Sequence, residues 1–239
     1  MPSRPAGHSS PPSAPNRTMP TLNYLALSQP ARACAWFIRY ADLEVDFRTI
    51  DLLKGEHKAP EYVAKFPAGQ VPTFEDGDFY LEESSVILKY LAAGHDIVPK
   101  CPKKAAKVNL LIARHDATGR KIATDIAGPI LFKTGDEQTK ALTEGRPVVE
   151  GILKKFDDAL DGSKYLLGDE LTLADFLFGT EIDQLEWLVD NPIVGDLLAE
   201  FPNVKAYYGR IKEVKGFAES FAEAKVVFDV FTAPKAAAN

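Results

Sequence analysis

The spacing of hydrophobic and polar residues changes several times over residues 21–91, as it does where short strands alternate with helices. Residues 21–27 have strand-forming character, and apolar residues at helical spacing follow over about 30–40. Residues 45–50 then alternate as a strand, before a polar loop with at most one short helix. The pattern predicts a β-α-β unit at the start of this region.

A hairpin and a second helix complete the same region. The sequences VPTFE and DFYL flank Asp76-Gly77, a dipeptide favoured in tight type I′ hairpin turns. The segment SSVILKYLA, which starts at Ser84, has helical spacing, with Glu83 and two serines at its N-terminus. The predicted order is β-α-β-(α)-β-β-α, which describes a compact α/β domain over 21–93.

The rest of the chain has a different pattern. Residues 94–104 contain two prolines and a glycine, which is typical of an interdomain linker. Long amphipathic runs such as VVEGILKKFDDAL follow, and they predict an all-helical domain over 105–239. In one of its helices Thr172 takes the N-cap position and Asp175 lies three residues later, as in a capping box.

Composition and charge exclude several classes of function. Of the 239 residues 46% are apolar, as in a folded, soluble protein. The 28 basic and 34 acidic residues give a net charge of −6, which disfavours binding to nucleic acid. No apolar stretch reaches the ~18 residues of a membrane span, so no membrane contact is expected. Two cysteines are too few for a disulfide framework or a zinc site, which favours a reducing compartment, the cytoplasm.

The segment 1–20 precedes the predicted domains. It is rich in Pro, Ser and Gly and lacks the apolar region of a secretory signal. We expect a disordered tail, an added segment, or sequence upstream of a start at Met19.

Three segments together resemble a cytosolic glutathione transferase. They are SQPAR at 28–32, FPAGQVPTFEDGDFYLEESSVILKYLA at 66–92 and LTLADF at 171–176. The resemblance covers about 21–230, and LLKGEHKAPEY followed by the middle segment is most similar to the theta class, which uses a serine. It implies a thioredoxin-like domain that binds glutathione, followed by an all-helical domain that forms most of the second-substrate pocket. It also implies a homodimer with glutathione as co-substrate, no metal and no other cofactor.

Ser28 is the candidate catalytic residue. A free cysteine thiol has a pKa of about 8.5, and a hydroxyl that donates a hydrogen bond to the sulfur favours its anionic form. Ser28 lies between the first predicted strand and helix, where the helix N-terminus adds positive potential. It matches the serine of theta-like enzymes. Two alternatives stay open: Ser28 could simply cap the helix, and Tyr24 could take the role that a tyrosine has in other classes.

The resemblance also assigns residues that bind glutathione. A Val71-Pro72 bond in this family is cis and presents the valine backbone to the cysteinyl backbone of glutathione, with the Gln70 amide beside it. Glu83 pairs with the γ-glutamyl ammonium, and Ser84 at the helix N-terminus binds the carboxylate. Each of these residues also has an ordinary structural explanation, such as strand entry or helix capping.

Other polar residues match the family less specifically. His57 matches a theta-type histidine that reaches the glycine carboxylate of glutathione, although a solvated loop histidine is the alternative. Arg120 falls where theta-like proteins carry an arginine near the active site, but a solvated helix arginine fits equally well. Three further residues are pocket candidates by helix position only, with ordinary packing favoured for each: His115, Phe132 and Trp187.

These matches imply a glutathione transferase that conjugates the glutathione thiolate to small hydrophobic electrophiles, a detoxification reaction. The same machinery suits reduction of organic peroxides. A non-catalytic glutathione-transferase-like binding or scaffold module is the alternative from another class. A glutaredoxin-like reductase that uses Cys34 is a second, but Cys34 lies within the predicted helix and fits a buried structural cysteine better.

Overall fold

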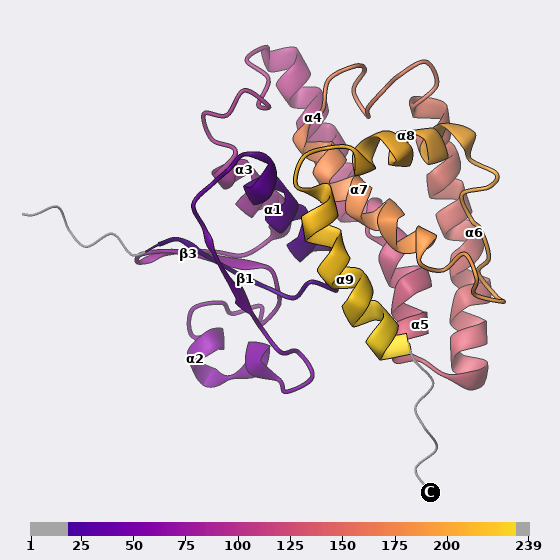
Figure 1. The fold of residues 1–239 in the computed structure, drawn as a ribbon, viewed down its shortest axis with the longest axis horizontal. Helices are drawn as coiled ribbons and strands as arrows, with labels where there is room; N and C mark the ends of the chain where they lie inside the picture. Colours follow the sequence, from indigo (N-terminus) through magenta and orange to yellow (C-terminus); the bar gives the residue numbers. More distant parts are fainter. Residues whose placement is uncertain (1–18, 233–239) are drawn as a thin grey trace, which may run out of the picture.

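The computed structural model describes residues 19–232, so the prediction for the tail up to residue 18 lies outside the described residues. A sheet with its helices forms one side of the molecule and a bundle of helices forms the other (Figure 1). This arrangement confirms the predicted fold class, an α/β thioredoxin-like domain followed by an all-helical domain.

The N-terminal half contains a mixed sheet in the order β2-β1-β3-β4. The strands are β1 (Thr21–Tyr24), β2 (Asp46–Thr49), β3 (Thr73–Asp76) and β4 (Phe79–Leu81). β1 pairs in parallel with β2 and antiparallel with β3, which pairs antiparallel with β4. A parallel pair needs a crossover connection, and α1 (Gln29–Tyr40) supplies it. The predicted β-α-β unit is thus present.

The hairpin turn differs from the prediction. Asp76 still pairs with Phe79, so the turn residues are Gly77 and Asp78, one position later than predicted. Gly77 has a φ of 63°, whereas Asp78 has no positive φ. This combination describes a type II′ turn, which needs glycine only at its first central position. The strand therefore continues through Asp76 until the glycine that can reverse the chain.

The helices of the N-terminal half lie in two groups. α1 packs against α3 (Ser84–Leu91), and both contact the helical half. The short helices η1 (Glu56–Lys58) and α2 (Pro60–Val63) follow β2. They lie over a small separate core of Ile50, Tyr62 and Phe66.

The C-terminal half is helical throughout its regular elements. The α-helices are α4 (Pro102–Arg114), α5 (Gly128–Phe132), α6 (Gly135–Ala159), α7 (Leu173–Glu186), α8 (Pro202–Lys212) and α9 (Phe217–Thr232). Two π-helical segments, η2 (His115–Gly119) and η3 (Ala123–Ala127), lie between α4 and α5. Such wide turns are frequent at functional sites. Within the described range, no helix is both long and apolar enough to cross a membrane.

The two halves share one hydrophobic core, in which α7 is central. The Trp36 ring of α1 lies 4.4 Å from the Phe176 ring of α7, and its Nε1–H donates to the Lys215 carbonyl at 3.0 Å. At the start of α7 the capping box is present, since the Asp175 carboxylate accepts the Thr172 backbone N–H at 2.7 Å. The packing of α1 on α7 fixes the start of α1, and hence Ser28, against the helical half.

Candidate active site

A cleft of about 800 Å³ opens at the N-terminal ends of α1 and α3. Its volume is typical of a small-molecule site, about 300–1,000 Å³. All the residues predicted to form the site line it: Ser28, His57, Gln70, Val71, Pro72, Glu83 and Ser84. They come from four separate segments of the chain, so the fold brings them together.

Ser28 is the N-cap residue of α1, but its side chain makes no capping hydrogen bond. Its backbone forms the turn: the N–H donates to the Leu25 carbonyl and the carbonyl accepts from the Arg32 N–H, both at 2.9 Å. The buried Arg32 guanidinium also donates to the Ala26 and Leu27 carbonyls at 3.0 Å. The turn is therefore held by its backbone, and Ser28 lines the cleft at the positive end of the helix without using its hydroxyl as a cap.

Tyr24, the alternative to Ser28, occupies a different environment. Its side chain is buried, and its hydroxyl donates to the Glu223 carboxylate of α9 at 2.9 Å. Burial raises the pKa of Tyr24, and the hydrogen bond to Glu223 raises it further. Tyr24 does not line the cleft that holds the other predicted residues. The geometry therefore favours Ser28.

Side chains from α2 and η1 hold the loop that carries Gln70 and Val71. The Val71-Pro72 peptide bond is cis, as predicted. The buried Tyr62 hydroxyl donates to the Gln70 carbonyl at 2.7 Å and lies 3.0 Å from the Thr73 hydroxyl. The Lys58 ammonium donates to the Gly69 carbonyl at 2.9 Å. Both ends of the segment that lines the cleft are thus anchored.

Removal of the Tyr62 hydroxyl should weaken glutathione binding. In Tyr62→Phe the Gln70 carbonyl loses its donor, and we expect the Kd for glutathione to rise about threefold to tenfold, as for loss of one buried hydrogen bond. Titration calorimetry would measure this change. Tyr80→Phe is the matched control, since Tyr80 is more exposed and its hydroxyl makes no hydrogen bond in the described part of the chain. Equal affinity in both variants would contradict the role of Tyr62.

Glu83 and Ser84 lie at the N-terminus of α3, on the cleft wall. Glu83 is the N-cap residue and has a φ of 66°, which is uncommon for a residue with a side chain. The neighbouring Glu82 accepts the Ala68 N–H at 3.0 Å, whereas Glu83 is exposed and makes no ion pair among the described residues. Glu83 is thus the carboxylate that can receive a ligand ammonium. Cys34 of α1 contacts the Ser84 carbonyl. Burial strongly raises the pKa of the Cys34 thiol.

His57 lies on η1 at the opposite wall of the cleft. Its Nδ1 is buried and has no hydrogen-bond partner in the described part of the chain. The neighbouring lysines are engaged elsewhere, Lys58 on the Gly69 carbonyl and Lys54 on Asp51 at 2.9 Å. His57 lines the cleft, so its side chain is placed to meet a ligand at this end.

A smaller pocket of about 210 Å³ adjoins the cleft. The two share Ser28, Leu52 and Arg120. The remaining residues of this pocket are mostly apolar: Leu25, Leu27, Gln29, Ala123, Thr124, Gly128, Leu131, Phe132 and Gln184. Phe132 thus lines this pocket, whereas His115 and Trp187 line neither it nor the cleft. No sequence pattern predicts this pocket, since its residues are spread over the segment before α1, the loop after β2, and α1, η3, α5 and α7.

Asp116 and Arg120 contribute charge to the cleft from the helical half. Sequence analysis missed Asp116, whose carboxylate accepts the Ser85 hydroxyl at 2.9 Å. Burial raises the pKa of Asp116, but hydrogen bonds from His115 and Ser85 outweigh it and hold this pKa below its usual value. His115 is buried, and the Arg120 guanidinium bonds to Glu181.

The titration of His115 should make stability depend on pH. Burial lowers the pKa of His115, but its hydrogen bonds to Asp116 and Glu181 raise it above the usual 6.5 overall. The charged imidazole thus stabilises the fold below pH 6.5, and this contribution is lost as the pH rises past the folded-state pKa. We expect His115→Gln to lower the free energy of unfolding more near about pH 6 than near about pH 9. Urea unfolding at both pH values measures this; an equal loss at both would contradict the charged state.

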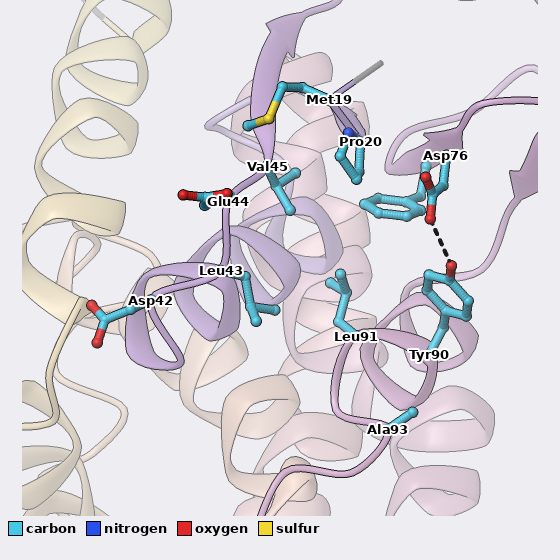
Figure 2. A pocket seen from close by; sticks show the side chains of 11 residues that line it. Met19, Pro20, Asp42, Leu43, Glu44, Val45, Asp76, Tyr90, Leu91 and Ala93 are labelled. Carbon is cyan, nitrogen blue, oxygen red and sulfur yellow. Dashed lines mark hydrogen bonds between the residues drawn. The ribbon is translucent and has the colours of Figure 1, made fainter. Parts of the chain in front are cut away.

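A separate hollow of about 560 Å³ lies near the start of β1 (Figure 2). Leu43, Val45 and Leu91 contribute its apolar wall, and the Tyr90 hydroxyl donates to Asp76 at 2.9 Å. It contains none of the residues predicted to form the site, which all line the cleft beside Ser28.

Comparison with known proteins agrees with this geometry. The family model of the glutathione S-transferase N-terminal domain matches residues 20–93, and that of the C-terminal domain matches 126–222. Human glutathione S-transferase theta-2B is 30% identical over 201 residues, which are 80% of this chain and 79% of that protein. Human theta-2 has the same identity over 202 residues.

Solved structures give the same result. The human theta-class transferase, in complex with the glutathione conjugate of 1-menaphthyl sulfate, superposes with a TM-score of 0.76 at 27% identity. The match covers 90% of this chain and 89% of that one. A delta-class transferase from Nilaparvata lugens gives a TM-score of 0.74 at 27% identity, covering 89% and 98%. With both domains matched in order and the predicted residues gathered in one cleft, the chain belongs to the glutathione S-transferase family and is a glutathione transferase similar to the theta class.

Proposed function

We propose that Ser28 activates glutathione for attack on a small hydrophobic electrophile. The observation that carries the proposal is the position of Ser28, which lies where the polar cleft meets the apolar pocket and whose hydroxyl makes no capping bond. That hydroxyl donates to the glutathione sulfur and favours its thiolate, and the thiol proton leaves to water. The thiolate then forms a carbon–sulfur bond. In a displacement the leaving group departs with its electron pair, and in a conjugate addition the adjacent carbon takes a proton from water.

Each of the cleft residues binds a different part of glutathione in this proposal. The Val71 backbone pairs with the cysteinyl backbone, with the Gln70 amide beside it. Glu83 binds the γ-glutamyl ammonium, and Ser84 with the α3 N-terminus binds the carboxylate. His57 reaches the glycine carboxylate at the other end. The exposed Glu83 and the position of His57 in the lining of the same cleft support this orientation.

Several broader properties belong to the same proposal. Reduction of organic peroxides uses the same thiolate. A homodimer is typical of the family, and both cysteines, Cys34 and Cys101, are free, as suits the cytoplasm. No metal or further cofactor is required, since glutathione brings the reactive sulfur. The linker at 94–104 and the domain bounds on either side of it stay predictions.

Glutathione binding and conjugation by the wild-type protein distinguish the proposal from the alternative, a non-catalytic binding or scaffold module. Glutathione affinity is measured by calorimetry, and turnover with 1-chloro-2,4-dinitrobenzene and with a small alkyl halide. We expect binding and conjugation of at least one electrophile. Failure to bind glutathione would favour a non-catalytic module, whereas binding without turnover of either electrophile would contradict the proposed reaction.

The glutaredoxin-like alternative is tested with a thiol-transfer assay. The buried Cys34, whose pKa burial raises, is a poor nucleophile. We therefore expect Cys34→Ser to keep whatever thiol-transfer activity the protein has. Its loss in that variant would favour the reductase.

A further inference from the structure

A buried His115–Glu181 pair lies behind the wall that the helical half contributes to the cleft. The His115 side chain is 1% exposed and that of Glu181 is fully buried. His115 Nε2 lies 3.2 Å from Glu181 Oε1. A buried carboxylate is costly unless it is paired, so its partners define what it does.

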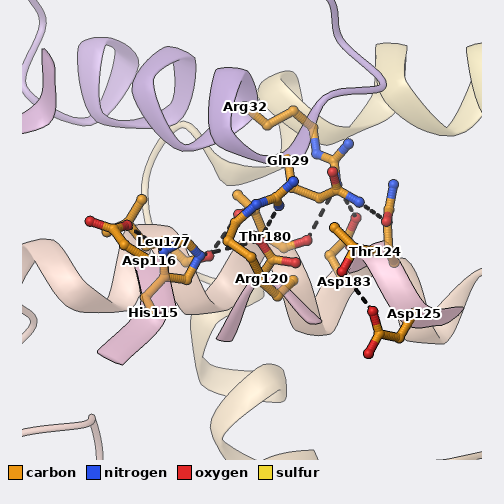
Figure 3. Close-up of polar contacts among 12 residues, drawn as sticks. Gln29, Arg32, His115, Asp116, Arg120, Thr124, Asp125, Leu177, Thr180 and Asp183 are labelled. Carbon is orange, nitrogen blue, oxygen red and sulfur yellow. Dashed lines mark hydrogen bonds and ion pairs between the residues drawn. The ribbon is translucent and has the colours of Figure 1, made fainter. Parts of the chain in front are cut away.

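The partners of this pair both reach the cleft. The Glu181 carboxylate receives the Arg120 guanidinium, and His115 Nδ1 lies 3.1 Å from the Asp116 carboxylate. Figure 3 shows the side chains of His115, Asp116 and Arg120 close together near Leu177 and Thr180 of α7. Asp116 and Arg120 line the cleft, while the pair behind them does not. The pair thus connects two charged groups of the active-site wall.

One oxygen makes both contacts of Glu181. Arg120 and His115 each meet Oε1, and Oε2 has no hydrogen-bond partner in the described part of the chain. Arg120 has a side chain that is 30% exposed and lines both pockets, where without this contact solvent would leave it several rotamers. The contact with Oε1 fixes the guanidinium of a residue that lines, together with Ser28, both the cleft and the apolar pocket.

The alternative is that Glu181 serves as the counter-ion of the buried Arg32 guanidinium, but the contacts of Arg32 fit this role less well. Arg32 donates to the backbone carbonyls of Ala26, Leu27 and Thr180. Its nearest carboxylate is that of Asp183, at 3.9 Å. Glu181 instead bonds to Arg120 and His115.

We propose that Glu181, supported by His115, is a positioning residue that holds the Arg120 guanidinium at the junction of the glutathione cleft and the apolar pocket. This inference rests on the proposed function. A positive charge fixed at that junction stabilises negative charge on the sulfur or on a departing anion without reorganisation during the reaction. Glu181 touches neither substrate, so its effect passes through Arg120.

The test is a double-mutant cycle between Glu181→Gln and Arg120→Ala. We expect each single variant to lower kcat about tenfold, with the Kd for glutathione changed less than about twofold, and the double variant to match Arg120→Ala alone. The ultraviolet absorbance of bound thiolate gives a second readout: the pKa of the bound thiol should rise equally in all three. A purely structural role would not move this pKa. Additive losses, or an unchanged kcat in folded Glu181→Gln, would overturn the inference.

Two further variants separate positioning from stability. Glu181→Asp keeps the carboxylate but shortens the side chain by one methylene, so the variant should fold. We expect its kcat to fall as much as that of Arg120→Ala. A kcat equal to that of the wild type would overturn the inference. Asp157→Asn is the matched control, because Asp157 accepts the Asn203 and Val204 N–H groups far from the cleft. It should lose stability and keep kcat. A wild-type protein that does not bind glutathione would instead overturn the proposed function.

Discussion

Replacement of Ser28 by alanine is expected to lower kcat/KM for conjugation about a hundredfold, the effect of losing a hydrogen bond to a charged group. The Ser28 hydroxyl makes no capping bond, so its loss removes little from the fold. Glutathione affinity should stay within about threefold of the wild-type value, because the loop at Val71 and the α3 N-terminus are unchanged. Stopped-flow or steady-state conjugation with 1-chloro-2,4-dinitrobenzene, alongside calorimetry, measures both quantities.

The reason for this split is electrostatic. The hydroxyl interacts more strongly with the thiolate than with the thiol, so its removal disfavours the anion specifically. The pKa of the bound thiol should therefore rise toward about 8.5, the value of a free cysteine thiol. A pH profile of kcat should move in the same direction, with activity recovering as the pH rises. An equal loss at every pH would contradict thiolate stabilisation.

Tyr24→Phe is the matched control for Ser28→Ala. Tyr24 donates its hydroxyl to Glu223 and lies outside the cleft lining, so we expect unchanged kcat and a modest loss of stability, about 1 kcal/mol. Loss of activity in Tyr24→Phe with full activity in Ser28→Ala would assign the chemistry to a tyrosine-type mechanism.

The residues proposed to bind glutathione could be picked out from the sequence, and the fold gathers them in one cleft, because they lie in short contiguous motifs. Val71-Pro72 and Glu83-Ser84 each occupy a boundary between elements, where turn and cap preferences restrict the residue types. The same preferences placed the capping box at Thr172 and Asp175. The hairpin turn lies one residue later than predicted, at Gly77-Asp78. Asp76 can end the strand and leave Gly77 as the first turn residue, so the Asp76-Gly77 dipeptide does not by itself fix the position of the turn.

The helical wall of the site could not be predicted in the same way. Asp116 and Glu181 are 65 positions apart on different helices, and only packing of η2 on α7 brings them to the same histidine. One sequence signal did exist. Glu181 and Asp183 interrupt the apolar run of α7, whose residues 173–185 are all buried. Charged residues in a fully buried helix must have partners, although the sequence does not say which ones.

Asp175 is expected to contribute the largest stabilising effect of any single side chain considered. Its buried carboxylate accepts the Leu166 N–H at 3.0 Å, the Thr172 N–H at 2.7 Å and the Tyr207 hydroxyl at 3.2 Å. Asp175→Ala removes the acceptor of the Leu166 N–H and of the Thr172 N–H and hydroxyl, at about 1–3 kcal/mol for each buried group, whereas the Tyr207 hydroxyl keeps the backbone carbonyl of residue 175 at 3.4 Å. We expect the free energy of unfolding in urea to fall by about 3–5 kcal/mol.

The pH dependence of this loss follows from the titration of Asp175. Burial raises its pKa to about 6 in spite of the donated hydrogen bonds, from an ordinary value of 3.8. The folded state thus binds the proton more tightly, and the stabilisation is complete below 3.8 and decreases as the pH rises through 6. The difference between wild type and Asp175→Ala should therefore be larger near about pH 5 than near about pH 8.

Asp158→Ala is the control for Asp175→Ala. Asp158 is an exposed residue of α6 that pairs with Lys154 one turn away, and such a pair contributes less than about 0.5 kcal/mol. If the free energy of unfolding fell by similar amounts in the two variants, the hydrogen bonds of Asp175 would stabilise the fold no more than a surface ion pair does. A larger loss near about pH 8 than near about pH 5 would show that the buried carboxylate stabilises the fold in its ionised form, opposite to the expected sign.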